Sequence, residues 1–190
     1  MTLYHYSVTY VKGEHLLSDY HGRYKDAEPF ILALEKSKEI FYAAYFSALY
    51  LERQIKDLNL RRYENCQKDA TEAIFEYVRR HEFEDEVSRL KCVYYCEELD
   101  EAVKCAMEDW IDCGDKTKEE VKMLQVEVDE ERVRRYDQTF YNEAYEAVEQ
   151  NDFEKAICLA KKYFAKLRTD SPIIEVLSDG NNRVVQEIVY

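Results

Sequence analysis

The stretch that decides the fold is SRLKCVYYCEELDEA, residues 88–102, where the pattern changes from that of a strand to that of a helix. Aromatic and β-branched residues across Leu90–Cys96 favour a strand. The segment that follows, 99–113, opens on a leucine and two acidic residues and is expected to be a helix, with Gly114 as its stop. Both kinds of element therefore meet within a few residues.

Further strands are predicted toward both ends of the chain. The segments are aromatic, β-branched or alternating in polarity, and they lie at 3–11, 121–128, 173–177 and 183–189. Between the last two, Ser178-Asp179-Gly180-Asn181 is typical of a turn, because Gly and Asn accept positive φ. The C-terminus is therefore predicted to be a β-hairpin.

Helices are predicted between these strands, at 30–57, 67–81, 138–149 and 152–167. Pro29 suits the first turn of the first helix, and Asn151 with Glu154 suits a capping box for the last. The long helix 30–57 is apolar over most of its circumference, so it is expected to be central or to pack on a partner. Because strands fall at both ends, the sheet must pair remote segments. This order predicts one mixed α+β domain over residues 1–190, with a helical middle and a split sheet.

The composition is that of an acidic folded chain. Of its 190 residues 46% are hydrophobic and 35% charged, and the formal net charge is −13. A surface this negative repels phosphate backbones and anionic lipids, so non-specific nucleic-acid binding and a membrane partner are not expected. No run of apolar residues is long enough for a membrane span.

Six cysteines are present without a CxxC pair, and we expect packed thiols in place of metal ligands. Cys92 and Cys96 are expected to share one face of their strand. Residues 1–20 carry charged and histidine side chains throughout, so they do not resemble a secretory signal. These features predict a cytoplasmic protein with reduced thiols and without a metal site.

Motifs for common chemistries are absent from the sequence. It has no Gly-rich phosphate loop, HExxH helix or GxSxG elbow, so any NAD site would need an architecture other than a Rossmann fold. His5, between Tyr4 and Tyr6 in the first strand, is either a histidine of the core or sheet edge or a hydrogen-bond partner for a sugar hydroxyl.

Several other side chains have both a structural and a functional interpretation. Arg89 and Arg79 fit either a phosphate or an ordinary ion pair on this acidic protein. Tyr94 and Tyr95 point to opposite faces of one strand, so one should lie in the core and the other can face a cleft.

Two carboxylates occur inside strands that are otherwise apolar. Glu175 lies in IIEVL and Glu187 in VVQEIV. Each faces either solvent or a cleft, and a carboxylate buried in a cleft needs a partner.

Five segments together resemble a group of small bacterial domains related to the ADP-ribosyltransferase fold. They spread over nearly the whole chain: YHYS (4–7), FEYVRRHEF (75–83), SRLKCVYYCEELDEA (88–102), DFEKAICLAKKYF (152–164) and PIIEVLSDGNNRVVQEI (172–188). The order and spacing of the segments carry the resemblance more than any single motif does.

The resemblance implies a split β-sandwich that holds NAD between two small sheets. His5 would hold the nicotinamide ribose, Tyr95 (or Tyr94) would stack on nicotinamide, and Glu175 would stabilise the positive charge that develops as nicotinamide leaves. Glu187 is the alternative carboxylate, and the two arginines are the candidate phosphate ligands. No acceptor-recognising loop is evident between residues 128 and 137.

Two functions follow from these patterns. The first is an NAD-dependent transferase of ADP-ribose to an unknown acceptor. The second is a non-enzymatic interaction module, in which helix 30–57 and the acidic surface meet a protein with a basic face.

Overall fold

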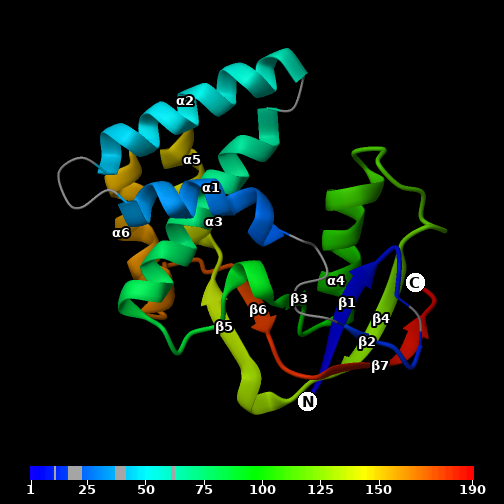
Figure 1. The fold of residues 1–190 in the computed structure, drawn as a ribbon. Coiled ribbons are helices and arrows are strands. Elements are labelled where there is room, and N and C mark those ends of the chain that lie inside the picture. Colours follow the sequence, from blue (N-terminus) through cyan, green and yellow to red (C-terminus); the bar gives the residue numbers. More distant parts are fainter. Residues whose placement is uncertain (11, 17–22, 37–41, 61–62) are drawn as a thin grey trace. The chain divides into compact units, whose positions relative to one another are not determined.

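A computed structural model of the chain describes residues 1–10, 12–16, 23–36, 42–60 and 63–190. Its contacts divide the chain into two compact units, each built from separate segments. We call residues 1–20, 92–135 and 175–190 the strand unit, and residues 21–91 and 136–174 the helical unit. The folded chain contains helices and sheets in a mixed α+β arrangement, as predicted (Figure 1).

The larger sheet has four strands in the order β1-β4-β7-β2. Their bounds are Thr2–Ser7 for β1, Lys122–Glu127 for β4, Asn182–Ile188 for β7 and His15–Leu16 for β2. All neighbouring strands in this sheet are antiparallel, so segments from the two ends of the chain are joined through β4. The short strand β2 was not predicted, because two residues are too few to produce an alternating pattern.

The smaller sheet has the order β3-β6-β5, with β3 at Val93–Tyr95, β6 at Ile174–Ser178 and β5 at Val133–Asp137. The strands β6 and β7 therefore lie in different sheets, and the predicted C-terminal hairpin is wrong. Gly180 in the connection meets a different requirement: a Cβ there would lie 2.8 Å from the Cβ of Arg132. The glycine permits a close approach between two chain segments.

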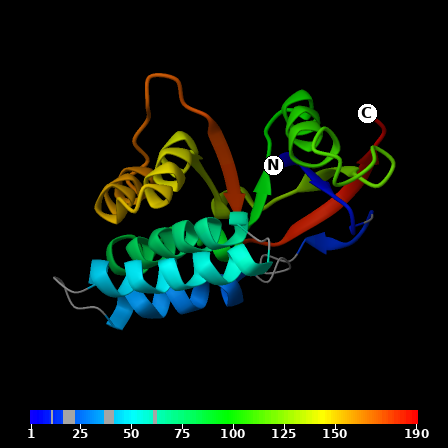
Figure 2. The same ribbon diagram turned by 90° about the horizontal axis from the view of Figure 1, so that it is seen from above.

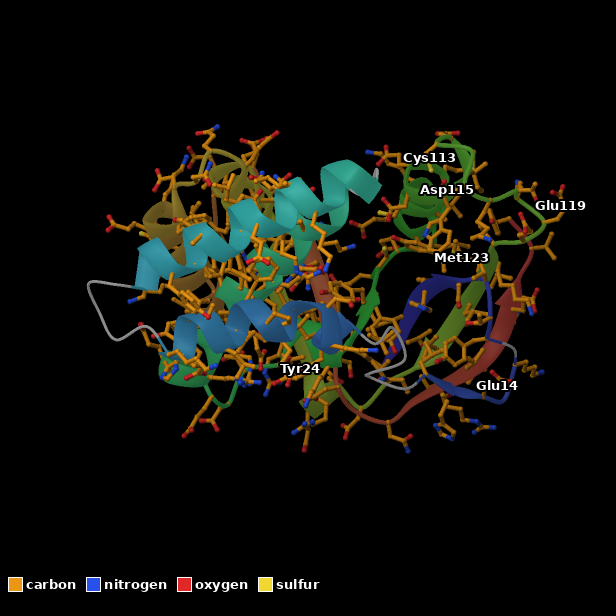
Figure 3. The ribbon with its side chains drawn as sticks, turned by 45° about the horizontal axis from the view of Figure 1, so that its top comes forward. Glu14, Tyr24, Cys113, Asp115, Glu119 and Met123 are labelled. Carbon is orange, nitrogen blue, oxygen red and sulfur yellow. The ribbon has the colours of Figure 1, made fainter. Side chains whose placement is uncertain are left out.

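Helix α4 (Leu99–Ala106) continues into a π-helical turn, η3 (Met107–Ile111), and covers one face of the larger sheet. Its cluster contains Ala102, Ala106, Val121 and Met123, the last of which is labelled in Figure 3. The opposite face carries a second cluster of ten buried side chains from both sheets, including Leu3, Tyr95, Leu124, Val126 and Val176. Gly114 follows η3 with a positive φ of 81°, as expected for a glycine that ends a helix.

The helical unit contains five α-helices among the described residues. Their bounds are Arg23–Lys36 for α1, Tyr42–Leu60 for α2, Tyr63–Glu82 for α3, Thr139–Glu149 for α5 and Phe153–Phe164 for α6. Aromatic rings fill the space between them, with Phe75 in contact with Tyr141, Tyr163 and Phe164. Nowhere in the described chain is a helix long and apolar enough to cross a bilayer.

The predicted helix 30–57 is divided between α1 and α2, which pack against each other (Figure 2). Two helices in mutual contact cannot be one continuous helix, so that prediction is corrected; its residues 37–41 lie outside the described part. Pro29 also lies inside α1 and not in its first turn. The apolar residues on several sides of this segment belong to two separate helix faces.

The N-terminus of α6 differs from the predicted capping box by one residue. Asp152 is the N-cap, and its carboxylate accepts from the Lys155 N–H at 3.0 Å. Asn151 instead adopts a positive φ of 60° between α5 and α6. Asparagine tolerates this conformation better than most residues do, so it serves the turn and leaves the cap to the aspartate.

Asp137, at the end of β5, holds together the segments around it in the helical unit. Its side chain is fully buried and accepts hydrogen bonds from the backbone N–H groups of Thr139, Thr169 and Ile173 and from the Thr169 hydroxyl. Burial raises the pKa of this carboxyl, but the hydrogen bonds from Thr169 and Thr139 outweigh burial and lower it from 3.8 to about 2. The charged form is therefore the one that the fold stabilises.

We expect Asp137→Asn to lower the free energy of unfolding at pH 7 by about 2 kcal/mol, the value that corresponds to the lowered pKa. Because the folded pKa is depressed, this stabilisation is present above pH 4 and is lost as the pH falls toward 2. Urea unfolding at pH 7 and pH 3 measures the difference. Asp170→Asn, at an exposed neighbouring site, is the control; equal effects of the two substitutions at pH 7 would contradict the assignment.

Candidate functional site

The two sheets meet at the edge of β1. Tyr4 and Cys96 form an isolated antiparallel bridge, with N–H···O distances of 3.0 and 2.9 Å between their backbones. Strand β1 is thus bonded to β4 along one edge and to the end of β3 at the other. This joint places the opening YHYS segment beside the Tyr94-Tyr95 pair, although some ninety positions separate them.

His5 is fixed at this joint by a main-chain acceptor. Its Nδ1 lies 2.8 Å from the carbonyl oxygen of Tyr94, and its ring meets the edge of the Tyr95 ring with centroids 5.8 Å apart. A carbonyl can only accept, so Nδ1 carries the proton. In the neutral imidazole Nε2 is then an acceptor, which is the role needed to bind a hydroxyl hydrogen.

A transverse row of side chains extends from His5 across the larger sheet. His5 is opposite Leu124 on β4, and Leu124 is opposite Glu187 on β7. Residues directly opposite in an antiparallel pair share a face, so these three side chains leave from the same side of the sheet. Glu187 is exposed, and its backbone lies about 10 Å from that of His5, two strand spacings away.

Tyr95 and Glu175 lie on neighbouring strands but on opposite faces of the smaller sheet. Tyr95 is paired with Val176, and both belong to the buried cluster on one face. Glu175 precedes Val176, so it points to the other face, together with Tyr94 and Leu177. The predicted residues therefore form two groups, His5 with Tyr95 and Tyr94 with Glu175.

Three of the four central residues are buried. His5, Tyr95 and Glu175 are 6%, 4% and 6% exposed, and Tyr94 is half-buried. A ligand could reach the imidazole only if the side chains that cover it moved. Glu187, the alternative carboxylate, is the one already in contact with solvent.

Arg89 belongs to the helical unit and lies in the short 3-10 helix η2 (Arg89–Lys91), where it forms an internal ion pair. Its Nε donates to Glu72 at 3.1 Å, one terminal nitrogen donates to the Tyr163 hydroxyl at 2.9 Å, and the guanidinium carbon lies 3.9 Å from the centre of the Tyr141 ring. Both charged side chains are about 95% buried. Of the two interpretations of Arg89, the structure therefore shows the ion pair. A phosphate could bind this guanidinium only by displacing Glu72.

Arg79 is engaged in the same way. It donates from two nitrogens to the Glu76 carboxylate at 3.0 Å and reaches the carbonyl oxygens of Glu84 and Glu86. Burial raises the pKa of Glu76, but hydrogen bonds from Arg79, Ser88 and Arg80 outweigh this and lower the pKa. Arg79 thus ties the end of α3 to the loop that follows it.

The cysteines are free thiols, and within the described ranges no group of three or more His, Cys, Asp or Glu side chains is arranged to hold a metal ion. Cys92 is buried, whereas Cys96 is half-buried and packs on the α4 cluster. Sequence reasoning gave no sign that Cys105 raises the pKa of the Cys96 thiol and that Cys96 lowers the pKa of the Cys105 thiol, because one cysteine follows a strand and the other lies on a helix, with no shared motif.

The family model described as "Protein of unknown function (DUF2441)" matches residues 5–190. A comparison with curated proteins finds none that matches. The family match begins at His5 and includes both units, so it takes in every residue of the candidate site. The chain therefore belongs to the DUF2441 family.

Proposed function

We propose that the chain binds NAD through its strand unit and transfers ADP-ribose from it to an acceptor. The observation that carries the proposal is the fixed orientation of the His5 imidazole. Its Nδ1 is held by the Tyr94 carbonyl at 2.8 Å, and the Tyr95 ring limits its rotation. If the side chains that cover these two rings move, an imidazole oriented in this way would turn an acceptor toward a ribose hydroxyl, and the aromatic ring beside it would offer a surface for nicotinamide. The sequence resemblance to ADP-ribosyltransferase-like domains supports the same roles.

The chemistry requires a fixed carboxylate near the ribose. The bond between the ribose C1′ and nicotinamide breaks with its electrons leaving on nicotinamide, and positive charge develops on the ribose. The acceptor nucleophile then bonds to C1′ and releases its proton. Glu175 is the carboxylate that the resemblance assigns, whereas Glu187 is the one that shares a face with His5. Both carboxylates are candidates for this role, and substitution of each one distinguishes them.

We expect NAD to bind to the full chain and His5→Gln to weaken its affinity about tenfold, the loss of one hydrogen bond to the ribose. Calorimetric titration with NAD measures both affinities, and circular dichroism confirms the fold of the variant. His15→Gln, at an exposed position on β2, is the matched control and should bind NAD like the wild type. Absence of binding at millimolar NAD would remove the proposal.

Release of nicotinamide tests the carboxylates separately from binding. We expect Glu175→Gln to slow the release by about 10²–10³-fold with NAD affinity retained, because the lost charge acts mainly in the transition state. Glu187→Gln is measured beside it by chromatography of free nicotinamide. If only Glu187→Gln slows the release of nicotinamide, then Glu187 is the carboxylate that stabilises the charge on the ribose. If neither substitution changes the rate, the transferase proposal fails.

A second function, a protein-interaction module, is favoured by one helix face. Tyr45, Leu51 and Ile55 on α2 are 53%, 56% and 53% exposed, and Ala48 lies between them at helical spacing. An exposed apolar stripe on a chain of net charge −13 suits an amphipathic helix with basic flanks.

Binding of a partner helix is tested with a basic amphipathic peptide, and fluorescence anisotropy measures the binding. We expect binding that weakens with added salt and is lost in Leu51→Asp, because a charge would enter the apolar contact. Leu167→Asp, at another apolar residue that is 50% exposed, is the control and should leave binding unchanged. Equal binding by wild type and Leu51→Asp would exclude this face.

A further inference from the structure

The connection between β6 and β7 places an aspartate directly before a glycine. It leads from the smaller sheet to the larger one (Figure 1), and its sequence is Ser178-Asp179-Gly180-Asn181. An aspartate before a glycine is prone to rearrangement, because glycine has no side chain to shield its backbone nitrogen from the aspartate carboxyl group. The local geometry therefore decides whether this pair of residues reacts.

The glycine is required here by the close approach of the short 3-10 helix η4 (Glu130–Arg132). A Cβ on residue 180 would lie 2.8 Å from the Cβ of Arg132 and 3.1 Å from its Cγ. Backbone conformation is not the reason, because Gly180 is not among the glycines with a positive φ. The packing of η4 therefore keeps a glycine after Asp179, and with it the reactive pair.

The same arginine binds the Asp179 carboxylate through two nitrogens. Arg132 Nε donates to one carboxylate oxygen at 3.0 Å, and a terminal nitrogen donates to the other at 2.8 Å. The side chain of Asp179 is 26% exposed and that of Arg132 is 54% exposed. Both carboxylate oxygens are thus engaged, in the paired geometry that fixes the orientation of a carboxylate.

The backbone nitrogen of Gly180 is held by a different partner. Its N–H donates to Ser178 Oγ at 3.2 Å, and the Ser178 hydroxyl donates to Asn182 Oδ1 at 3.1 Å. The Asn182 side-chain nitrogen donates in turn to the Gly180 carbonyl oxygen at 3.0 Å. Ser178 and Asn182 are fully buried. The carboxylate and the amide nitrogen that would have to react are therefore each bound elsewhere.

We propose that Asp179 is an isoaspartate-forming site and that Arg132 restrains the reaction. In the first step the Gly180 nitrogen bonds to Asp179 Cγ and closes a five-membered succinimide. One carboxylate oxygen leaves as water, with the amide proton and a proton from solvent. Water then adds to the former backbone carbonyl of Asp179 and breaks its bond to the Gly180 nitrogen, so the main chain runs through Cγ. The inference does not depend on NAD binding.

The ion pair opposes the first of these steps. The carboxylate must turn toward the Gly180 nitrogen and lose an oxygen, and both changes break its hydrogen bonds to Arg132. The product would contain one additional main-chain carbon between β6 and β7. The turn that Ser178 and Asn182 close would then have to accommodate a longer connection between the two sheets.

The experiment ages the full chain at neutral pH and detects isoaspartate with a protein isoaspartate methyltransferase and labelled S-adenosylmethionine. Cleavage after Arg168 and Arg183 gives the peptide 169–183, in which electron-transfer dissociation locates the modified residue. We expect Arg132→Ala to form isoaspartate at Asp179 about fivefold faster than the wild type, the factor that corresponds to the loss of a well-formed exposed ion pair. Circular dichroism verifies that the variant folds.

Two variants serve as controls. Arg135→Ala removes a nearby arginine that pairs with Glu97 at 2.7 Å, and it should age like the wild type. Asp179→Glu in the Arg132→Ala background should lose the signal in peptide 169–183, because a glutamate would have to close a six-membered ring. Deamidation of a neighbouring asparagine is recognised separately, since it changes the peptide mass and isomerisation does not.

Added salt tests the ion pair without a substitution. Because salt screens exposed charges, it should accelerate isomerisation in the wild type and leave Arg132→Ala unchanged. If Arg132→Ala does not fold, this measurement decides alone, and a wild-type rate that salt does not change overturns the inference.

Three results with the folded variants would also overturn it. The first is an equal rate of isomerisation at Asp179 in the wild type and Arg132→Ala. The second is an acceleration in Arg135→Ala as large as that in Arg132→Ala, since the effect would then not belong to the Asp179 ion pair. The third is an Arg132→Ala chain in which isoaspartate accumulates elsewhere while Asp179 stays unmodified.

Discussion

The bonding of β1 along both of its edges is the constraint on which the strand unit depends. One edge pairs with β4 over Thr2–Ser7, and the other meets β3 at the bridge between Tyr4 and Cys96. That bridge links the two sheets through a pair of backbone hydrogen bonds. The bridge fixes the register of β3 beside β1, and this register brings the Tyr94 carbonyl to His5 Nδ1. The same contact that joins the sheets also orients the imidazole.

Strand alternation decides which residues at this joint can act together. His5 and Tyr95 emerge on the face that carries the ten-residue cluster, and Tyr4 and Cys96 emerge on the face covered by α4. One residue of shift would exchange these roles, because the side-chain period is two. Glu175 lies on β6, the strand paired with that of Tyr95, but it points to the opposite face of the smaller sheet. A carboxylate that acts on a ribose held by His5 must therefore approach from the cluster face or from the sheet edge.

Much of the architecture could be predicted from local pattern, and the failures have identifiable causes. Strands at β1, β4 and β6 have clear aromatic or alternating patterns. Strand β5 was missed because its sequence, VRRYD, places two arginines where a hydrophobic pattern was expected. The turn at residues 178–181 was recognised, but a turn reports a change of direction and not which strands pair. Strand pairing depends on contacts far along the chain, so the C-terminal segment was wrongly taken as a hairpin.

The site illustrates the same limit. The sequence suggested His5 and Tyr95 as partners, and the structure places their rings in contact. It also offered ion-pair and phosphate interpretations for Arg89, and only burial and partners could distinguish them. A buried guanidinium next to Glu72 is stabilised by that carboxylate, and removal of either partner would leave an unpaired buried charge. Sequence spacing carries no information on such a pair, because Glu72 and Arg89 lie on different elements.

These ion pairs would also restrict how the chain could bind a dinucleotide. The chain has 27 basic and 40 acidic residues, and Arg79, Arg89, Arg132 and Arg135 each already bind a carboxylate. A diphosphate that recruited one of them would release a carboxylate and gain little net attraction. Binding of NAD would then be held mainly by hydroxyl and backbone donors and by ring contacts, which salt screens weakly. If the chain binds NAD as proposed, a small salt dependence of that binding would thus be the physical consequence of an acidic protein in which these four arginines already pair with carboxylates.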